Sequence, residues 1–366
     1  MKKGMKYLTG IIVLLILIFA VYAVYVFTAY ERLPDNMVLE IEKNEGESFP
    51  ENAQTGENTK KSLPPKIYSI MTYNIGFGAY LPEYSFFMDG GKSSWGKDKE
   101  SVTGAVCGAG KLMRDASPDL VLLQEVDRDG TRSYHIDELE LMNQFFDGYY
   151  YTYAQNYDSP FLFYPLWEPH GANKAGLVTY SKMPIAEAVR RSLPISESFS
   201  KLVDLDRCYS VSRIPVENGK TLCVYNMHMS AYGSSDEIRS GQLAMLYEDM
   251  ETDYKNGDYV ICGGDFNHNL KAEERGDEPE WAYPFPRESL PEGFRMAIDE
   301  AKEAEDISHN TCRSAKEPYD AGTTYTVTLD GFIVSDNVVV DSYLHVNSGY
   351  QYSDHEPVIM EFELEE

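Results

Sequence analysis

The pattern of hydrophobic and polar residues divides the chain into three unequal parts. The first is an apolar run from Leu8 to Tyr30 that contains no charged residue. As a helix rising about 1.5 Å per residue, this run would span about 34 Å, enough to cross a bilayer. The second part, from Pro34 to Pro65, is rich in Glu, Asn, Lys, Gly and Ser and has little periodicity, which is typical of a solvated tether. We expect the folded part to begin after it.

In the third part, short apolar runs alternate with segments of helical periodicity. The pattern predicts one helix over Lys99–Ala116, broken at Ser117-Pro118, and an amphipathic helix over Glu237–Asp253. The runs that predict strands are Ile67–Tyr73, Leu120–Leu123, Gly176–Tyr180, Thr221–Tyr225, Tyr259–Cys262 and Leu329–Val334. This alternation is typical of an α/β domain.

Several of the predicted strands end in polar side chains. These are Asn74, Glu125, Asn226, His228, Asp265 and Asn267. Strand ends that converge on one edge of a sheet are where α/β proteins build their sites. The pattern therefore predicts a functional site made from segments that are far apart in the sequence.

The composition and net charge of the chain limit the classes of partner that it is expected to bind. The chain has 32 Lys plus Arg against 59 Asp plus Glu, a formal net charge of −27, and it is 43% hydrophobic and 13% aromatic. This composition excludes a disordered chain. A nucleic-acid binder needs Lys and Arg to displace counterions, so extended nucleic acid is disfavoured, although a bound metal or a local basic patch can overrule net charge. The five cysteines form no Cys-x-x-Cys pair, and neither a zinc ribbon nor a complete disulfide framework is indicated.

Several common catalytic motifs do not occur in the sequence. Gly110-Lys111 would need a Gly at position 105 and a Ser or Thr after the Lys to form a phosphate-binding P-loop, but these positions hold Ala105 and Leu112. The chain contains no His-Glu-x-x-His and no Gly-x-Ser-x-Gly. Zincin and serine-hydrolase functions therefore lose support.

The polar residues match the needs of phosphoester hydrolysis. This reaction needs a hard cation held by one or two carboxylates, a base for water, and donors for the developing charge. The sequence offers Glu125 and Asp265 at strand ends, several amides, His228, and His355 beside Asp354. Each residue alone has an ordinary structural explanation, but their joint order is more specific.

Six segments, in this order, resemble the endonuclease/exonuclease/phosphatase superfamily. They are Thr72-Tyr73-Asn74-Ile75-Gly76, Leu123-Gln124-Glu125-Val126, Asn226-Met227-His228-Met229-Ser230, Gly264-Asp265-Phe266-Asn267, Asp330-Gly331-Phe332-Ile333-Val334-Ser335 and Ser353-Asp354-His355-Glu356-Pro357. The similarity runs from about Ile67 to Phe362. The sequence departs from the family at Lys182, where relatives usually carry Arg, and at Gly331, where they often carry an aromatic residue.

The resemblance implies a four-layer α/β sandwich, with two mixed β-sheets packed face to face and helices outside, here preceded by one N-terminal transmembrane helix. It also implies Mg²⁺ or Mn²⁺ as cofactor. The expected organisation is a cytoplasmic N-terminus over residues 1–6, a transmembrane signal anchor over 7–30, a flexible linker over 31–65 and an endonuclease/exonuclease/phosphatase domain over 66–366.

The resemblance also implies roles for single residues. The metal ligands would be Asn74, Glu125 and Asp354, and the catalytic residues would be His228, Asp265, Asn267, Asp330 and His355. In this scheme Asp265 and Asn267 handle the attacking water and the phosphate, Asp330 orients His355, and His228 donates to a phosphate oxygen or the leaving group. Either Asp265 or His355 is the base. His228 matches the two-histidine members, such as secreted deoxyribonucleases, sphingomyelinases and inositol-phosphate phosphatases.

Two further features are candidates for substrate contact. Asn226 and Arg132 are expected to bind phosphate or substrate, and for Arg132 a salt bridge is the alternative. The segment from Phe145 to Trp167 is unusually aromatic and is expected either to line a pocket, to touch the bilayer, or to be a buried strand and loop.

The sequence thus predicts a metal-dependent phosphoester hydrolase, acting on a small or lipid-headgroup substrate, on the outer face of a membrane. Lys2, Lys3 and Lys6 precede the apolar run, so the positive-inside rule places the N-terminus in the cytoplasm and the domain outside the cell membrane. We expect a single-pass protein that is monomeric. Cleavage of the N-terminal segment as a signal peptide is the alternative topology. An extracellular nuclease and a non-catalytic surface binding module are the alternative functions.

Overall fold

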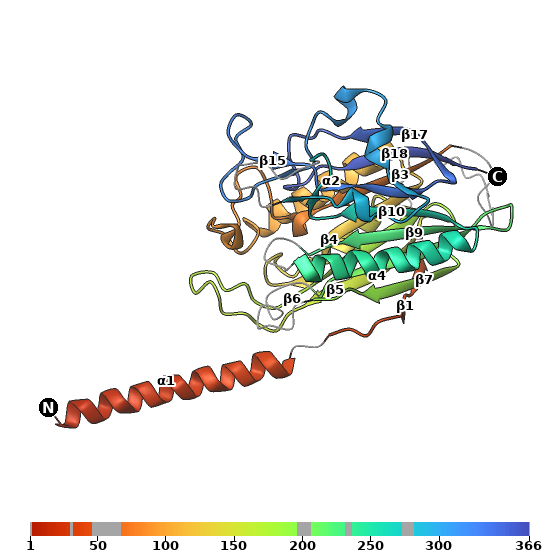
Figure 1. Ribbon diagram of the computed structural model, residues 1–366. Helices are drawn as coiled ribbons and strands as arrows, with labels where there is room; N and C mark the ends of the chain where they lie inside the picture. The colour runs from red at the N-terminus through yellow and green to blue at the C-terminus, as the bar shows by residue number, and fades with distance from the viewer. Residues whose placement is uncertain are drawn as a thin grey trace.

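The folded part of the molecule is a four-layered α/β sandwich (Figure 1). The structure is a computed structural model that describes residues 2–29, 32–45, 67–195, 206–230, 236–272 and 282–365. Two mixed sheets, each of seven strands within these ranges, pack face to face. Helices α2 (Lys99–Ala116) and α3 (Glu138–Asn143) pack on one sheet, and α4 (Asp236–Lys255) packs on the other. The sandwich predicted from the sequence is confirmed.

The first sheet has the strand order β1-β7-β8-β9-β10-β16-β13. Its strands are β1 (Met37–Val38), β7 (Glu187–Ser192), β8 (Cys208–Pro215), β9 (Thr221–His228), β10 (Tyr259–Asp265), β16 (Asp330–Ser335) and β13 (Phe294–Met296). The second sheet has the order β17-β18-β3-β4-β6-β5-β2. Its strands are β17 (Val338–His345), β18 (Val358–Leu364), β3 (Tyr68–Asn74), β4 (Leu120–Gly130), β6 (Asn173–Ser181), β5 (Tyr150–Asp158) and β2 (Ile41–Lys43).

Short strands and 3₁₀ helices lie in the connections between the main strands. Two small sheets of two strands each are formed by β11 (His268–Asn269) with β12 (Tyr283–Pro284) and by β14 (Cys312–Arg313) with β15 (Thr326–Val327). The short 3₁₀ helices are η1 (Gly76–Gly78), η2 (Phe87–Asp89), η4 (Arg287–Ser289), η5 (Ala297–Glu300) and η6 (Ala304–Ile307).

The sandwich arises from strands that are apolar on both faces. In β4, Leu120 and Leu122 pack between the two sheets, whereas Val121 and Leu123 pack toward α2. Successive side chains of a strand point to opposite faces, so a continuous apolar run fills two layers at once. Burial of this kind, at roughly 25 cal/mol per Å² of apolar surface, is the main source of stability for the sandwich.

Helix α2 has the start and end that its sequence predicts. Asp98 caps it by accepting a hydrogen bond from the backbone N–H of Ser101 at 2.7 Å, and Ser117 ends it in the left-handed conformation just before Pro118. Its buried residues recur at helical spacing, which is why one face packs on the sheet.

Helix α1 (Lys2–Ala29) projects from the sandwich (Figure 1). Residues Gly4–Ala29 are long and apolar enough to cross a membrane, by length and composition, and most of their side chains are exposed. Because the helix lies near the N-terminus, a signal sequence would have the same properties.

The flexible linker expected over residues 31–65 is wrong for its first part. Strand β1 pairs with β7 at the edge of the first sheet, and β2 pairs with β5 at the edge of the second. The physical reason is the run from Met37 to Lys43, which is apolar enough to add to two sheet edges, with Leu39 buried between the two short strands. The rest of the predicted linker, residues 46–65, lies outside the described residues.

The aromatic segment from Phe145 to Trp167 divides into two parts. Strand β5 and the residues before it contribute buried rings, such as Phe146 and Tyr151, to the layer between the second sheet and α2. The loop after β5 instead exposes its apolar side chains, among them Leu166 and Trp167. A buried strand therefore explains only the first half of the segment.

Candidate functional site

The strand register brings the predicted residues to one end of the sandwich. In the first sheet, β9 and β10 are parallel and β16 is antiparallel to β10, so that Asp265 pairs with both His228 and Asp330. In the second sheet, β3 and β4 are parallel, and β18, which follows His355, is antiparallel to β3. The carboxyl ends of four strands and the start of two others therefore meet at the left-hand end of Figure 1.

Glu125 is placed by a bulge in β4. The register of β4 with β6 shifts between Leu123 and Val126, and Glu125 has a φ of +56°, in the left-handed region. Bulges of this kind redirect side chains next to active sites. The Glu125 side chain keeps 22% of its surface exposed, and its Oε1 lies 3.9 Å from Nε2 of His228.

Asn74 connects the two carboxylates of the site. Its Nδ2 donates to Oε1 of Glu125 at 3.2 Å and to Oδ2 of Asp265 at 3.1 Å, while its Oδ1 accepts from the N–H of Gly76 at 3.0 Å. The amide nitrogen of Asn74 therefore positions the two carboxylates, while Oδ1 accepts one hydrogen bond and keeps a second lone pair. The metal-ligand role expected from the sequence stays a prediction.

Asp265 is held by several donors at the end of β10. Its Oδ1 accepts from the backbone N–H of Asn267 at 2.8 Å, and its Oδ2 lies 3.5 Å from Nε2 of His228 and 3.7 Å from Nε2 of His355. Burial raises the pKa of Asp265 to about 6, against the positive charge of His355 and the amide donors, which lower it. The carboxyl group is therefore ionised at neutral pH.

Gly264 permits the close approach that delivers Asp265 to this position. It has a φ of +146°, and a Cβ atom built on it would lie 1.9 Å from the carbonyl oxygen of Met227 on β9. No side chain fits between the two strands at this point without moving the backbone.

We expect Gly264→Ala to lower the free energy of unfolding by at least about 3 kcal/mol, because it adds a backbone clash to an unfavourable φ. Gly219→Ala is the matched control: Gly219 also has a positive φ, but no atom lies within 4 Å of its built Cβ, so only about 1 kcal/mol of conformational cost is expected. Thermal unfolding followed by circular dichroism measures both variants, and equal losses would contradict the explanation by close approach.

His355 and Asp330 form a buried pair. Nδ1 of His355 lies 2.8 Å from Oδ2 of Asp330, and Asp330 is fully buried. Burial disfavours the charged imidazole, but the negative charge of Asp330 and its neighbours outweighs burial and raises the pKa of His355 well above its usual value. The pair therefore presents a protonated Nε2 toward Asp265.

His228 has the opposite electrostatic character. Burial, together with the positive charges of Arg207 and His355, lowers its pKa well below the usual value. Its Nδ1 has no hydrogen-bond partner within the described residues, and its Nε2 faces Asp265 and Glu125. His228 is thus a neutral imidazole that can donate from Nε2.

Asp354 and Asn267 lie at the partly exposed rim of the site. Burial raises the pKa of Asp354 to about 6, the charge of Glu125 adds to the rise, and His355 and Arg313 oppose it. Asn267 has a φ of +48° and donates its side-chain amide to the carbonyl of Met229 at 3.0 Å. Both side chains are half-buried and flank the buried imidazoles.

Asn226 does not reach the substrate face. It is fully buried between the sheets, where its Nδ2 donates to the carbonyls of Leu123 and Val178 and its Oδ1 accepts from Nε2 of Gln124 at 2.9 Å. The expected role in phosphate binding is not supported, because both polar atoms already link the two sheets below the site.

Arg132 is likewise paired with another residue, Asp127. Its Nε and Nη2 donate to the two carboxylate oxygens of Asp127 at 3.1 and 2.7 Å, and its guanidinium lies 3.8 Å from the ring centroid of Phe77. Only 5% of the residue is exposed. The salt bridge considered as the alternative is the observed arrangement, and we do not assign Arg132 to phosphate binding.

The donor set fits a hard divalent cation. Within the described residues no Lys or Arg forms an ion pair with Glu125, Asp265, Asp330 or Asp354, so histidines supply the nearest positive charge, with a contribution from Arg313 at Asp354. Burial is the main cause of the raised pKa values of Asp265 and Asp354, and the negative charges of neighbouring carboxylates add to it. Carboxylate oxygens at the partly exposed rim are the ligands that Mg²⁺ and Mn²⁺ prefer.

Several supporting residues were missed in the sequence. Thr311 accepts the backbone N–H groups of Leu329 and Asp330 through its Oγ1, and its carbonyl accepts from the N–H of Glu356. Ser353 donates to the carbonyl of Asn74 at 2.8 Å. These contacts tie together the segments that carry the catalytic pair, but single Thr and Ser residues carry no sequence signal for this role.

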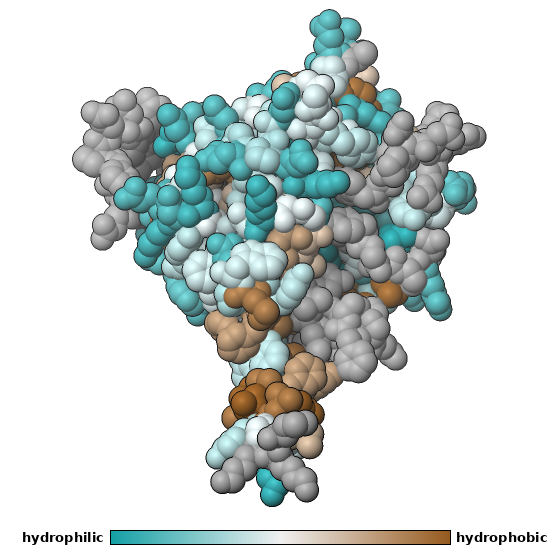
Figure 2. Space-filling model, turned by 90° about the vertical axis from the view of Figure 1, so that its left-hand side faces the viewer, coloured by the Kyte–Doolittle hydropathy of each residue, from teal (hydrophilic) through white to brown (hydrophobic). Residues whose placement is uncertain are grey.

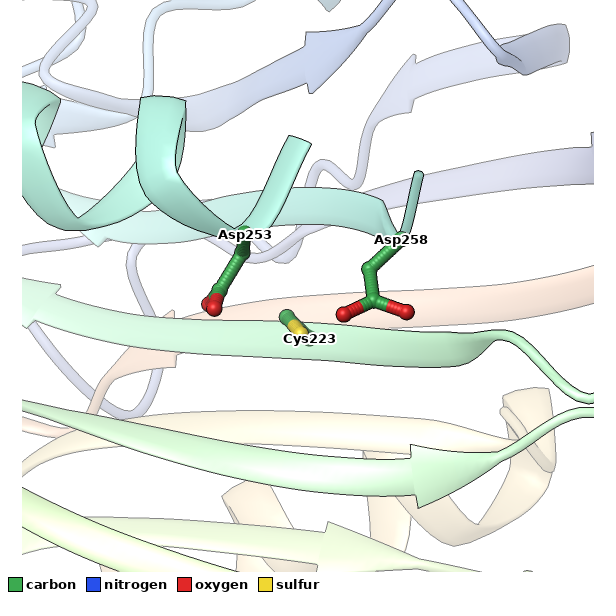
Figure 3. A group of neighbouring side chains, drawn as sticks. All are labelled: Cys223, Asp253 and Asp258. Carbon is green, nitrogen blue, oxygen red and sulfur yellow. The ribbon is translucent and has the colours of Figure 1, made fainter. Parts of the chain in front are cut away.

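A second acidic group lies elsewhere on the first sheet. Cys223, Asp253 and Asp258 converge between β9 and the end of α4 (Figure 3). Nη1 of Arg213 donates to Oδ1 of Asp253 and to Sγ of Cys223, both at 2.9 Å. The guanidinium supplies the cation for this group, which lies about 17 Å along β9 from His228, so it is a structural ion pair.

Solved structures share this fold. The endonuclease/exonuclease/phosphatase from Beutenbergia cavernae superposes with a TM-score of 0.58 at 17% identity, over 82% of this chain and 72% of that one. The catalytic domain of human Nocturnin, with bound sulfate, gives 0.54 at 19% identity, over 82% and 94%. ANGEL2, a 2′,3′-cyclic phosphatase in complex with adenosine-2′,3′-vanadate, gives 0.56 at 14% identity, over 82% and 97%.

Comparison of the sequence with known families supports the assignment of the site. No curated protein matches the sequence closely enough to count as a relative. The sequence model of the endonuclease/exonuclease/phosphatase family, however, matches residues 71–355, a range that contains every residue of the candidate site. The chain therefore belongs to the endonuclease/exonuclease/phosphatase family and is an enzyme of the phosphoesterase and nuclease class.

Proposed function

We propose that this protein is a divalent-metal-dependent hydrolase of phosphodiester or phosphomonoester bonds, held at the outer face of a membrane by α1. The observation that carries the proposal is the convergence of Glu125, Asp265 and the His355–Asp330 pair, from four separate segments, at one end of the sandwich. A sealed structural cluster would bury all its charges, whereas Glu125 keeps part of its surface open to solvent.

We assign the base to Asp265 and the donors to the histidines. Asp265 is ionised at neutral pH and keeps lone pairs free beyond its two amide donors, so it can accept a proton from water. His355, kept protonated by Asp330, and neutral His228 each present an N–H toward the same space, where they stabilise negative charge on phosphoryl oxygens. Glu125 and Asp354 would hold the metal ion, which when bound neutralises charge on the phosphate.

We propose the class of substrate from the net charge of the chain. With a net charge of −27, the surface repels long polyanions, so a small or lipid-headgroup phosphoester is favoured over a nuclease substrate. One similar structure is described as a 2′,3′-cyclic phosphatase, which supports a small phosphodiester as a test compound.

Incubation of the purified full chain with plasmid DNA, sphingomyelin vesicles and bis(4-nitrophenyl) phosphate, each with and without EDTA, tests the proposal. We expect hydrolysis of a vesicle or small-ester substrate that EDTA lowers by at least about 100-fold and that Mg²⁺ or Mn²⁺ restores, because the metal supplies several kcal/mol of charge stabilisation. Cleavage of plasmid alone would contradict the substrate preference. Absence of EDTA-sensitive hydrolysis on all three substrates would favour a non-catalytic binding module.

A further inference from the structure

An apolar patch lies on two neighbouring loops of the folded domain. Of the nine large apolar side chains that the described residues outside α1 expose, five belong to these loops. The five residues, which we call the loop patch, are Met88, Phe163, Tyr164, Leu166 and Trp167, and their exposed fractions run from 50% to 82%. Grouped apolar exposure of this kind marks an interaction surface.

The loop that carries most of the patch is fixed at its base. Leu162 and Gly171 exchange two backbone hydrogen bonds of 3.0 Å, and the carboxylate of Glu168 accepts the backbone N–H groups of Ser94 and Trp95. The loop is thus tied to its neighbour by polar contacts, while its apolar side chains stay in the open.

Helix α1 contacts the same loop. The hydroxyl of Tyr22 donates to the carbonyl of Phe161 and accepts from the N–H of Phe163, and the hydroxyl of Tyr25 accepts from the N–H of Phe161, all at 3.1 Å. These tyrosines precede Ala29 by seven and four residues, about 10 and 6 Å along the helix axis. If α1 spans a bilayer, the loop therefore lies at the depth of the lipid interface, where tyrosine and tryptophan are enriched.

The arrangement in space agrees with these contacts. In Figure 1, the carboxyl end of α1 lies below the sandwich and the helix extends beyond the left-hand end, where β9 and β10 end, so a bilayer perpendicular to α1 lies on that side of the domain. Figure 2 views this end directly and shows apolar side chains next to the apolar stretch of α1, on a face that is otherwise largely hydrophilic where it is coloured.

We propose that the loop patch inserts into the interface of the bilayer that α1 crosses, so that a lipid surface is its partner. The net charge of −27 gives no general attraction to anionic lipids, so apolar and aromatic burial drives the insertion. High salt should therefore leave the docking unchanged.

Docking of the patch also places the mouth of the candidate site at the lipid headgroups. Met88 lies in the short helix η2, where the ring of Phe87 packs 5.8 Å from the ring of Tyr164 in the loop patch. The neighbouring ring of Phe86 packs 5.7 Å from Tyr80, and a Cβ atom built on Gly76 would lie 2.7 Å from the Tyr80 ring and 3.2 Å from Oδ1 of Asp354. A membrane-embedded phosphodiester is then the substrate class, a deduction that rests on the proposed hydrolase activity, whereas docking rests on α1 spanning the bilayer and needs no catalysis.

Fluorescence quenching tests docking without turnover. The chain has three tryptophans and none lies in α1, so Trp95→Phe with Trp281→Phe leaves Trp167 as the only emitter. In phosphatidylcholine vesicles, we expect brominated lipid to lower the emission of Trp167 about two-fold or more, in both low and high salt. The matched control is a chain whose only tryptophan comes from Val339→Trp, an exposed position near the start of β17, at the end of the sandwich opposite the site. Equal quenching at both positions, or none at Trp167, would overturn the proposal.

A second measurement separates docking from catalysis. We expect Leu166→Glu combined with Trp167→Glu to abolish binding of the patch and to slow hydrolysis of a vesicle-embedded phosphodiester about ten-fold, with no change on a water-soluble aryl phosphodiester. Val339→Glu, at the opposite end of the sandwich, should leave both rates unchanged. Quenching at Trp167 with no hydrolysis of either ester would refute the proposed function and leave docking intact, whereas equal slowing on both esters would refute the link between docking and substrate.

Discussion

Glu125→Gln should reduce turnover about 1,000-fold or more, since several kcal/mol of charge stabilisation depend on the metal that this carboxylate would hold. The substitution removes the negative charge but keeps the shape of the side chain and an oxygen that can accept from Nδ2 of Asn74. Because Glu125 sits on a bulge and keeps part of its surface exposed, its neutralisation should leave the fold intact.

The loss has a readout that is independent of activity. Binding of Mn²⁺ to the full chain, followed by electron paramagnetic resonance, should weaken at least about ten-fold in Glu125→Gln. The control is Glu140→Gln, which neutralises an exposed glutamate in the first turn of α3, and it should bind and turn over like the wild type. Turnover of Glu125→Gln within ten-fold of the wild type would remove Glu125 from the metal site.

The position of the site could be predicted from the sequence because strand ends carry its residues. Apolar runs that end in Asn74, His228 and Asp265 identify buried strands, and the shared direction of such strands places their ends together. Glu125 was found by the same reasoning, but the structure differs in one respect: β4 continues to Gly130, because the bulge lets the strand pair with β6 beyond it.

Roles that depend on which atom faces which could not be predicted. Asn226 and His228 are two residues apart in β9 and share a face, so periodicity alone does not show that Asn226 lies one step deeper, between the sheets. The sequence alone allows Arg132 to bind a phosphate. Only the structure shows that its guanidinium is already paired with Asp127. For Asn74, the N–H of Gly76 decides which end of the amide faces the carboxylates.

The family departure at Gly331 has a structural explanation. A Cβ atom built on Gly331 would lie 2.7 Å from the hydroxyl oxygen of Tyr343 and 2.8 Å from a side-chain carbon of Leu270. An aromatic ring supplied by β17 thus occupies the space next to Asp330. Such compensation between distant segments cannot be seen in one sequence, because nothing in the local pattern connects position 331 with position 343.

The His355–Asp330 pair is where we expect the second large effect. Asp330→Asn and His355→Gln should each lower turnover about 100- to 1,000-fold, the range lost when one donor to developing negative charge is removed. Because the two residues act as one unit, the double variant should lose little more than either single variant. His135→Gln is the control: His135 also pairs with a carboxylate, at 2.5 Å from Asp129, but both side chains are exposed and far more solvated.

The pH profile distinguishes this role from a purely structural one. In the wild type, Asp330 holds the pKa of His355 well above its usual value, so activity that needs the imidazolium is kept at neutral pH and lost as the pH rises through that raised pKa. In Asp330→Asn the effect of burial, which lowers the pKa, is opposed less strongly, because the charge of Asp265 remains but that of Asp330 is lost, and the alkaline loss of activity should move to lower pH. Additive losses in the double variant, together with an unchanged alkaline limb, would show that Asp330 supports the fold and does not tune His355.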